Sequence, residues 1–335
     1  MVPALAVADA LRADGAEIVF AGGERAEAEM VPAAGYELRR LSVEGLSRRN
    51  PLKAARSLAR ATGALLRART LLREVDPAAV LGGGGYVSGP VGLAAALQRI
   101  PLVLMEADSH LGLANRLLAP FARRVCLAFP IDGRTGDRFR VTGRPIQPPA
   151  TDRRAARARF GLGPRDFCVL IFGGSLGAKS INDAAVRAFA EADFRILHIA
   201  GRRNFPSLVS PGPHYDLRDY VEDFNEALLA CDLVVARAGG SVFEIAAHAR
   251  PAVLIPYPHA TADHQASNAA WMAEAGAAVV LHDDELMPMR LAEAVHSLLE
   301  DPERLAEMRA ASAELARPAA ARAVAAQVTA AAAGR

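Results

Sequence analysis

The sequence predicts an α/β protein built from two Rossmann-like, doubly wound domains that face a cleft. Three observations support this fold class: short apolar runs alternate with helical patterns, several of those runs end in glycine-rich turns, and a proline-rich segment divides the chain near its middle. Strands that alternate with helices form parallel sheets covered by helices on both faces. Such sheets bind ligands at the carboxyl ends of their strands, so each half is expected to carry a site there.

The individual elements follow from apolar periodicity and from turn residues. Apolar runs predict strands at 17–21, 78–81, 102–105, 124–128, 167–172, 194–199, 233–236, 252–255 and 277–281. Helical periodicity predicts helices at 3–13, 52–74, 91–98, 182–191 and 242–248, and one alanine-rich helix at 302–333. Pro3 suits the first turn of its helix because the fixed φ of proline is already helical.

The domain boundary is predicted from the prolines at 145, 148 and 149, which cannot continue a helix or a central strand. We expect an N-terminal domain at 1–146 and a C-terminal domain at 147–335, with the last helix packing back on the N-terminal domain. A doubly wound domain normally has a strand before its first helix. We therefore also expect that this sequence is an N-terminally truncated form of a longer protein whose true start lies upstream.

Composition excludes several classes of protein. The chain has 335 residues, and 39 Lys and Arg against 37 Asp and Glu give a net charge of +2, which does not predict nucleic-acid binding. Its three cysteines are far apart and fit neither a disulfide framework nor a zinc site, which favours a reducing compartment. No apolar run reaches the roughly 18 residues of a membrane span, and the first residues do not resemble a signal peptide.

The sharpest motif is the turn at 173–182, which follows an apolar strand and precedes a helix. Gly174 and Gly177 let backbone N–H groups approach a phosphate, and Ser175 adds a hydroxyl donor. The helix N-terminus contributes about half a positive charge. We interpret this turn as a phosphate site; the alternative is a tight turn that happens to be rich in glycine.

A second glycine-rich turn lies at 82–90, again between a strand and a helix. Its candidate ligand contacts are Gly84, Gly85, Tyr86 and Ser88. Consecutive glycines lower stability through chain entropy, and they are tolerated where backbone passes close to a ligand. We interpret it as a second phosphate-facing loop, with a flexible loop as the alternative.

Two further segments after strands carry candidate donor-binding residues. The run at 236–244 contains Arg237, Gly239 and Glu244, and a carboxylate there can accept hydrogen bonds from ribose hydroxyls. The alternative for Glu244 is an acid that complements the helix dipole. In the segment 256–268, Gln265 and Asn268 share a helix face, and their amides suit sugar hydroxyls. Capping of that helix is the simpler reading.

Two carboxylates and one basic helix complete the candidates. Glu106 and Asp108 follow the strand at 102–105, where this fold places its chemistry, although an ordinary loop explains them equally well. The segment 48–73 holds many basic residues and no acid, and one helical stripe of it comprises Lys53, Arg56, Arg60 and Arg67. A basic amphipathic helix is typical of a membrane-surface element. The alternative is a core helix with a solvated arginine face.

Together and in this order, these motifs resemble the MurG family, the GT-B-fold N-acetylglucosaminyltransferases of peptidoglycan synthesis. The matching segments are 82–90, 173–182, the run ending at Glu244, and 263–268 with Gln265. His264 stands where the family has a glutamine, and we include it among the donor contacts. Residues 3–8 resemble the helix that follows the family's first glycine-rich loop.

The resemblance implies an inverting glycosyltransferase that moves N-acetylglucosamine from UDP-N-acetylglucosamine to lipid I and so makes lipid II. Ser175 would lie at the donor diphosphate, Glu244 at the ribose and Gln265 at the sugar hydroxyls. The N-terminal half would bind the undecaprenyl-linked acceptor, and Asn115 matches an asparagine of that region. The family implies no metal, no cofactor beyond its substrate, and no nucleic-acid partner. It also implies a peripheral place on the cytoplasmic side of the cell membrane, at an anionic surface.

The sequence also departs from the family. The family's candidate base is a histidine of the first glycine-rich loop, which this sequence lacks. The family's His-Glu-Gln-Asn run reads Met105-Glu106-Ala107-Asp108 here. We therefore take Asp108 as the candidate general base, with Glu106 second. Two alternatives stay open: a UDP-N-acetylglucosamine 2-epimerase on the same fold, and a donor-binding protein whose catalysis is impaired by the truncation.

Overall fold

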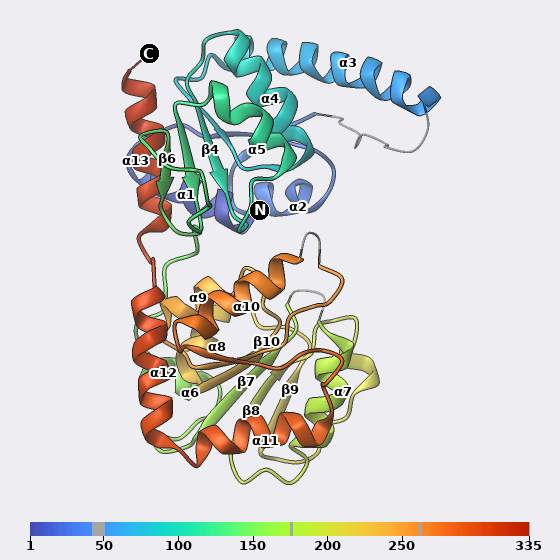
Figure 1. The fold of residues 1–335 in the computed structure, drawn as a ribbon, viewed down its shortest axis with the longest axis vertical. Helices are drawn as coiled ribbons and strands as arrows, with labels where there is room; N and C mark the ends of the chain where they lie inside the picture. Colours follow the sequence, from blue (N-terminus) through green and yellow to red (C-terminus); the bar gives the residue numbers. More distant parts are fainter. Residues whose placement is uncertain (42–50, 175–176, 261–262, 335) are drawn as a thin grey trace. The chain divides into compact units, whose positions relative to one another are not determined.

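The computed structural model describes residues 1–41, 51–174, 177–260 and 263–334, with backbone alone for 51–61. The chain divides into two compact units (Figure 1). The first comprises Met1–Gln147 together with Pro318–Arg335, and the second comprises Pro148–Arg317. The chain therefore crosses between the units at the proline-rich segment and again before its last helix.

The first unit contains a four-stranded parallel sheet in the order β3-β4-β5-β6 and a separate parallel pair, β1-β2. These strands are β1 (Val19–Gly22), β2 (Glu37–Arg40), β3 (Val80–Gly82), β4 (Leu102–Glu106), β5 (Arg124–Leu127) and β6 (Phe139–Val141). Every residue of β4 is buried, as expected for a central strand of a parallel sheet. The sequence analysis missed β2 and β6 because both are short and mostly exposed, so neither shows an apolar run.

Helices pack on both faces of the four-stranded sheet and on the β1-β2 pair. They are α1 (Val2–Ala13), α2 (Ala26–Ala33), α3 (Pro51–Val75), α4 (Gly85–Leu97), α5 (Leu113–Leu118) and α13 (Ala320–Ala333). On one face, Val7 of α1 and Val324 of α13 share a core with Val103 and Met105 of β4. On the other, Ala68 of α3 joins residues of α4 and α5 against the same sheet. Figure 1 shows both units of the chain, each with its helices and its sheet.

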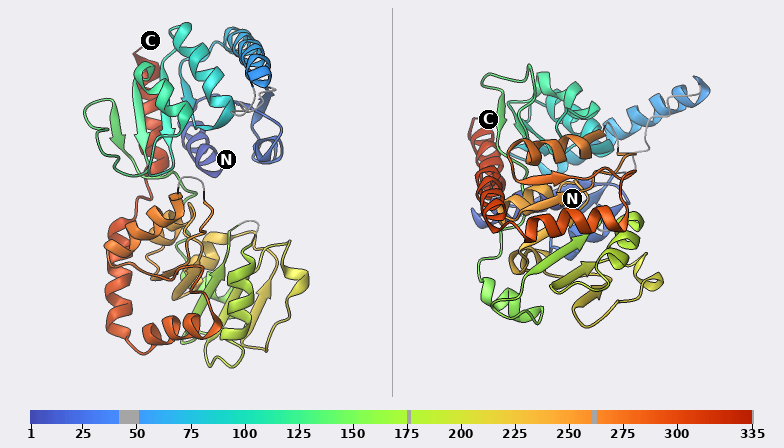
Figure 2. Two further views of the ribbon diagram at one scale, coloured as in Figure 1. Left: turned by 45° about the vertical axis from the view of Figure 1, so that its right-hand side comes forward. Right: turned by 60° about the horizontal axis from the view of Figure 1, so that its bottom comes forward.

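The second unit holds a six-stranded parallel sheet in the order β12-β11-β10-β7-β8-β9. Its strands are β7 (Cys168–Phe172), β8 (Arg195–Ile199), β9 (Tyr215–Arg218), β10 (Leu233–Ala236), β11 (Ala252–Leu254) and β12 (Ala278–Val280). Its helices are α6 (Arg153–Arg159), α7 (Lys179–Ala188), α8 (Phe224–Ala230), α9 (Val242–Ala247), α10 (His264–Glu274), α11 (Pro288–Leu299) and α12 (Pro302–Leu315). Helices α7 and α11 pack on one face of the sheet, and Figure 2 shows them from two further sides.

The prediction of one continuous helix at 302–333 is wrong. The structure ends α12 at Leu315 and starts α13 at Ala320. Pro318 explains the break, because its ring clashes with the preceding turn of a helix and disfavours helical backbone at the residue before it. The break matters for the fold, since it lets α12 belong to the second unit while α13 joins the first.

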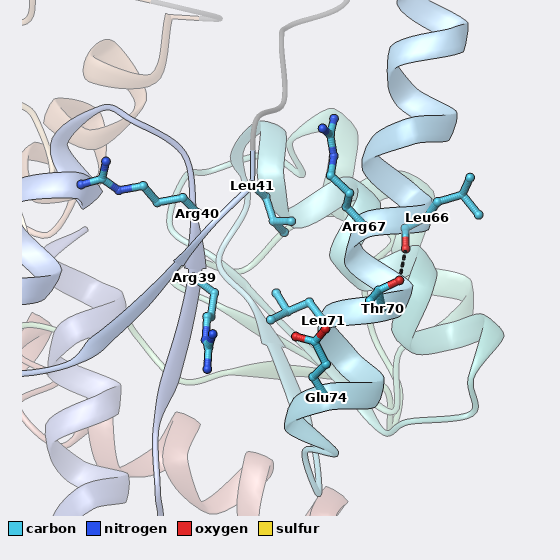
Figure 3. Close-up of a pocket in the computed structure, with 8 residues that line it drawn as sticks. All are labelled: Arg39, Arg40, Leu41, Leu66, Arg67, Thr70, Leu71 and Glu74. Carbon is cyan, nitrogen blue, oxygen red and sulfur yellow. Dashed lines mark hydrogen bonds between the residues drawn. The ribbon is translucent and has the colours of Figure 1, made fainter.

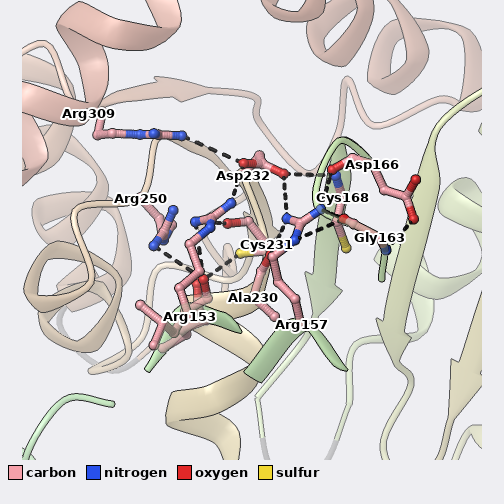
Figure 4. Close-up of polar contacts among 12 residues, drawn as sticks. Arg153, Arg157, Gly163, Asp166, Cys168, Ala230, Cys231, Asp232, Arg250 and Arg309 are labelled. Carbon is pink, nitrogen blue, oxygen red and sulfur yellow. Dashed lines mark hydrogen bonds and ion pairs between the residues drawn. The ribbon is translucent and has the colours of Figure 1, made fainter. Parts of the chain in front are cut away.

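A partly buried ionic cluster lies at the amino ends of the second sheet, opposite the edge where ligands are expected (Figure 4). Asp232 accepts hydrogen bonds from Arg153 at 2.6 Å and Arg157 at 3.4 Å, and from the backbone N–H of Cys168 at 3.1 Å. Arg309 of α12 lies 3.7 Å from the same carboxylate. Asp232, the residue before β10, therefore connects α6, the start of β7 and α12.

Candidate active site

The turn between β7 and α7 has the geometry expected of a phosphate site. Gly174 and Gly177 have φ values of 91° and 74°, which glycine adopts without strain. A Cβ on Gly177 would lie 2.1 Å from the carbonyl oxygen of Ala200, so a larger residue cannot be placed there without moving the turn. Ser175 lies outside the described residues, and its role at the diphosphate therefore stays a prediction.

The first turn of α7 is open to an anion. Its N-cap residue, Ala178, makes no side-chain capping hydrogen bond, so the capping role is not filled by a protein group at this residue. The first N–H groups of a helix have no partners inside the helix, and they carry the positive end of the helix dipole. A ten-residue helix placed directly behind a glycine turn therefore suits a phosphate group.

Arg237 directly follows β10, as the sequence predicted, and its side chain is engaged within the protein. It is buried, with 7% of its surface exposed, and its guanidinium forms an ion pair with Asp283 at 2.7 Å. It also donates to Ser180 Oγ at 2.8 Å and to the carbonyl oxygens of Ile255 and Pro256. These contacts join the carboxyl ends of β10 and β11 to α7, so we assign Arg237 to positioning the site rather than to direct donor contact.

Asn268 also acts within the protein. Its Nδ2 donates to the carbonyl oxygens of Ala238 at 2.9 Å and Gly239 at 3.3 Å, which fastens α10 to the turn before α9. Only 4% of Asn268 is exposed, and its Oδ1 has no hydrogen-bond partner among the described residues. The predicted amide is thus at the site, but it shapes the turn that contains Gly239.

The remaining predicted donor contacts lie at the starts of α9 and α10. Glu244 is half-buried in the first turn of α9. His264 and Gln265 are the first residues of α10. Gln265 Oε1 accepts a hydrogen bond from the backbone N–H of Tyr257 at 2.9 Å, which fixes its amide orientation. Its Nε2 is then the end that can donate to a ligand.

In the first unit, the carboxylate of Glu106 organises the loop after β4. Its Oε1 accepts from the N–H groups of Ala107 and Asp108, and its Oε2 accepts from Gly112 N–H and Asn115 Nδ2. A carboxylate has about four lone-pair positions, so these donors fill them. These contacts favour a role for Glu106 in holding the loop, and its expected role as second candidate base stays a prediction.

Asp108 sits in the loop that Glu106 holds and stays the candidate base. It is half-buried, and Arg144 Nη1 donates to the neighbouring carbonyl oxygen of Ala107 at 3.1 Å. The loop backbone is therefore fixed from both sides. A general base must lie within hydrogen-bond reach of the proton that it takes, and a fixed loop backbone favours such a placement of Asp108.

The second glycine turn leads from β3 into α4. Gly84 and Gly85 have φ values of 82° and 78°, and no side chain caps the helix that follows. Tyr86 is 58% exposed, and the guanidinium carbon of Arg25 lies 5.4 Å from the centre of its ring. The turn thus combines an uncapped helix N-terminus with an arginine and an exposed aromatic ring.

Two predicted acceptor contacts, Ser88 and Asn115, lie beneath this turn. Ser88 is 9% exposed and Asn115 is 1% exposed. Ser88 Oγ and Asn115 Oδ1 are both buried without a hydrogen-bond partner among the described residues. The Nδ2 of Asn115 donates to Met105 O and to Glu106. Asn115 therefore joins α5 to the end of β4.

Sequence reasoning missed the polar residues that support the donor turn. Ser180 and Asp283 hydrogen-bond to each other at 2.9 Å and to Arg237. Asp283 follows β12, so its place after a strand end is the signal that would have identified it. Ser180 and Asn182 belong to the motif singled out from the sequence, but their partners lie far along the chain.

Within the described ranges, no group of three or more His, Cys, Asp or Glu residues is placed to hold a metal ion. None of the described helices is both long and apolar enough to cross a membrane. The side chains of Lys53, Arg56 and Arg60 are outside the described part of the chain, while Arg67 lies exposed on α3.

Two parallel α/β units, each with a glycine turn opening a helix at the carboxyl edge of its sheet, define a glycosyltransferase of the GT-B fold. The chain matches the glycosyltransferase family 28 N-terminal domain over residues 1–127 and the C-terminal domain of that family over 168–324. It belongs to the family of UDP-N-acetylglucosamine–N-acetylmuramyl-(pentapeptide) pyrophosphoryl-undecaprenol N-acetylglucosamine transferases.

Individual relatives cover nearly the whole chain. The transferase of that name from Moorella thermoacetica is 40% identical, over 96% of this chain and 93% of that protein. The one from Rubrobacter xylanophilus is 41% identical, over 97% of this chain and 98% of that protein. The crystal structure of Acinetobacter baumannii MurG superposes with a TM-score of 0.77 at 26% identity, covering 98% of this chain and 95% of that one.

Proposed function

We propose that this protein transfers N-acetylglucosamine from UDP-N-acetylglucosamine to the undecaprenyl-linked lipid I and so produces lipid II. The observation that carries this proposal is about 40% identity along nearly the whole chain to transferases named for that reaction. Both units, each with its own glycine turn, are therefore part of the relationship. The names of these relatives favour sugar transfer over the 2-epimerase alternative.

The second unit is the donor half of the proposal. Its β7–α7 turn and the uncapped α7 N-terminus receive the diphosphate. Glu244, in the first turn of α9, accepts hydrogen bonds from the ribose, and the Nε2 of Gln265 donates to a sugar hydroxyl. Arg237 and Asn268 hold the turns on which these groups sit.

The first unit is the acceptor half. The β3–α4 turn, with Gly84, Gly85 and Tyr86, receives the acceptor diphosphate at the uncapped N-terminus of α4. An acceptor hydroxyl attacks the anomeric carbon of the donor, the bond from that carbon to UDP breaks, and Asp108 takes the hydroxyl proton. The configuration at the anomeric carbon inverts because the attack comes from the side opposite to UDP.

The reaction as proposed uses no metal ion. The leaving diphosphate develops negative charge, and a helix N-terminus with its open N–H groups stabilises such charge without a cation. Transfer that persists in excess EDTA supports this part of the proposal, whereas transfer that needs added Mg²⁺ contradicts it.

The basic helix α3 is the proposed contact with an anionic membrane surface on the cytoplasmic side. Where α3 meets the end of β2, a shallow hollow of about 400 Å³ is lined by three arginines, Arg39, Arg40 and Arg67 (Figure 3). Leu66, beside it on α3, is 60% exposed. Basic groups around an exposed leucine match a surface of lipid phosphates over apolar chains.

The test of the function is a transfer assay with purified protein, labelled UDP-N-acetylglucosamine and lipid I in detergent. Formation of labelled lipid II establishes the proposal. Release of N-acetylmannosamine or its UDP derivative without transfer would establish the epimerase instead. Binding of UDP with neither product would identify a donor-binding protein.

A further inference from the structure

A chain of buried hydrogen bonds runs from β9 through β8 to α7, behind the donor turn. The phenol of Tyr215 lies 2.8 Å from His198 Nδ1, and His198 Nε2 lies 3.0 Å from Asn182 Oδ1. Asn182 Nδ2 then donates to the carbonyl oxygen of Ala200 at 2.9 Å. His198 and Asn182 are 0% exposed and Tyr215 is 3% exposed, so no part of this chain is a surface feature.

The direction of every hydrogen bond in this network follows from its final acceptor, the carbonyl oxygen of Ala200. A carbonyl oxygen can only accept, so Ala200 fixes the amide nitrogen of Asn182 toward it and leaves Oδ1 toward His198. His198 must then donate from Nε2, which makes Nδ1 the acceptor, and Tyr215 must donate its hydroxyl proton. Burial lowers the pKa of His198 to about 4, which keeps the imidazole neutral and compatible with this order.

This chain of hydrogen bonds ends at the carbonyl oxygen of Ala200, against which the donor turn packs. A Cβ on Gly177 would lie 2.1 Å from the carbonyl oxygen of Ala200, so Gly177 packs directly on the group that Asn182 holds. Asn182 is itself in the early part of α7, and its N–H bonds to Ala178 O just after the turn. One amide thus fixes both the start of α7 and the surface against which the turn rests.

We propose that Tyr215, His198 and Asn182 form a positioning relay that sets the donor turn for the diphosphate of the UDP-sugar. The three residues do not touch the ligand; they act through Ala200 and Gly177. This inference rests on the proposed function, because the turn is taken to bind the donor. A fully satisfied buried network holds a single geometry, whereas a network that loses one donor leaves its neighbour unpaired at a free-energy penalty.

The test measures UDP binding by calorimetry in the full chain. Tyr215→Phe removes only the first donor, and Asn182→Asp keeps the acceptor for His198 but removes the donor to Ala200. Each variant should bind UDP about tenfold more weakly, the effect of one hydrogen bond lost from a buried network. In turnover, KM for UDP-N-acetylglucosamine should rise while KM for the acceptor stays unchanged.

The matched control is Phe189→Leu, at the other end of α7. Phe189 is 0% exposed in the same core, and its side chain takes part in none of the relay's hydrogen bonds. It should lose stability without losing UDP affinity. The inference is overturned if the relay variants keep wild-type affinity, or if Phe189→Leu weakens UDP binding as much as they do.

A second measurement does not depend on how the variants fold. Nitrogen NMR of wild-type protein should show His198 as the neutral form with its proton on Nε2. A proton on Nδ1 in the wild type would overturn the relay. Failure of the wild type to bind UDP would instead overturn the proposed donor site, and the relay's function with it.

Discussion

Asn115 Nδ2 donates a hydrogen bond to Glu106 Oε2 over 2.9 Å, between α5 and the end of β4. Together with three backbone N–H groups, this contact engages both oxygens of the Glu106 carboxylate, so Glu106 holds the loop and we expect Asp108 rather than Glu106 to take the proton. The loop also carries Asp108, the candidate base. By holding this loop through Glu106, the buried amide of Asn115 can affect the proposed proton transfer.

Replacement of the candidate base is the direct test of this division of roles. Asp108→Asn should lower kcat for sugar transfer by about 10²–10⁴-fold, the usual contribution of a general base. UDP affinity should not change, because the donor contacts lie in the other unit. Steady-state transfer kinetics and calorimetry check both statements. Asp132→Asn, an exposed change in the same unit, is the control, and full activity of Asp108→Asn would reject the assignment.

The ribose contact predicts a loss of donor affinity. Glu244→Ala should weaken UDP binding by about 1–3 kcal/mol, as for a lost hydrogen bond to a charged group. Calorimetric titration with UDP measures the difference. Glu293→Ala, an exposed change on α11, should leave the affinity unaltered. An unchanged dissociation constant for Glu244→Ala would remove the ribose from its proposed place.

The donor turn predicts a steric effect at one glycine. Gly177→Ala places a Cβ 2.1 Å from Ala200 O, so the turn must shift and UDP binding should be lost. Gly161→Ala has a similar positive φ of 63° but open space around the new Cβ, and it isolates the backbone strain. That control should lower stability by about 1 kcal/mol and leave UDP binding intact. Equal effects on binding would contradict the packing argument.

The membrane proposal predicts salt-sensitive binding to anionic vesicles. Reversal of Lys53, Arg56 and Arg60 to Glu should release the protein from vesicles that contain phosphatidylglycerol, because each basic residue contributes about 1 kcal/mol near such a surface. Flotation at increasing salt should show progressive release of the wild type, since the attraction is screened.

The control for that experiment reverses three exposed arginines of the second unit, Arg154, Arg290 and Arg304. It changes the net charge by the same amount and should leave vesicle binding nearly intact. Release by both triple variants would show a general effect of charge, and binding to neutral vesicles at high salt would argue against an electrostatic contact.

Burial of His198 predicts a pH dependence of stability. Its pKa is lowered to about 4 in the folded protein, while an unfolded histidine titrates near 6.5. Between these values the unfolded chain binds a proton that the folded one does not, so the free energy of unfolding falls as pH drops from about 6.5 to 4. Urea unfolding across this range should show the decline, and His198→Gln should lack this contribution. An equal decline in that variant would assign it to other groups.

Much of the donor site was predictable because its signals are local. The turn at Gly174 and Gly177 needs positive φ, which glycine adopts easily. A glycine shortly before a helix therefore indicates both the turn and the uncapped helix N-terminus that follows it. Ser175 was predicted on the same grounds, but the described residues exclude it. Strands β2 and β6 are short and mostly exposed, so neither shows an apolar run in the sequence.

The sequence by itself predicted most strands of the two units and the glycine turns at the carboxyl ends of two of them, which are the proposed anion sites. These features depend on the conformational limits of a few neighbouring residues. Only the tertiary structure decided which polar side chains face a ligand and which hold the backbone. Arg237 pairs with Asp283, and Glu106 is filled by donors from its own loop and α5. Those partners meet through folding of distant segments, and a buried charge takes whichever partner satisfies it.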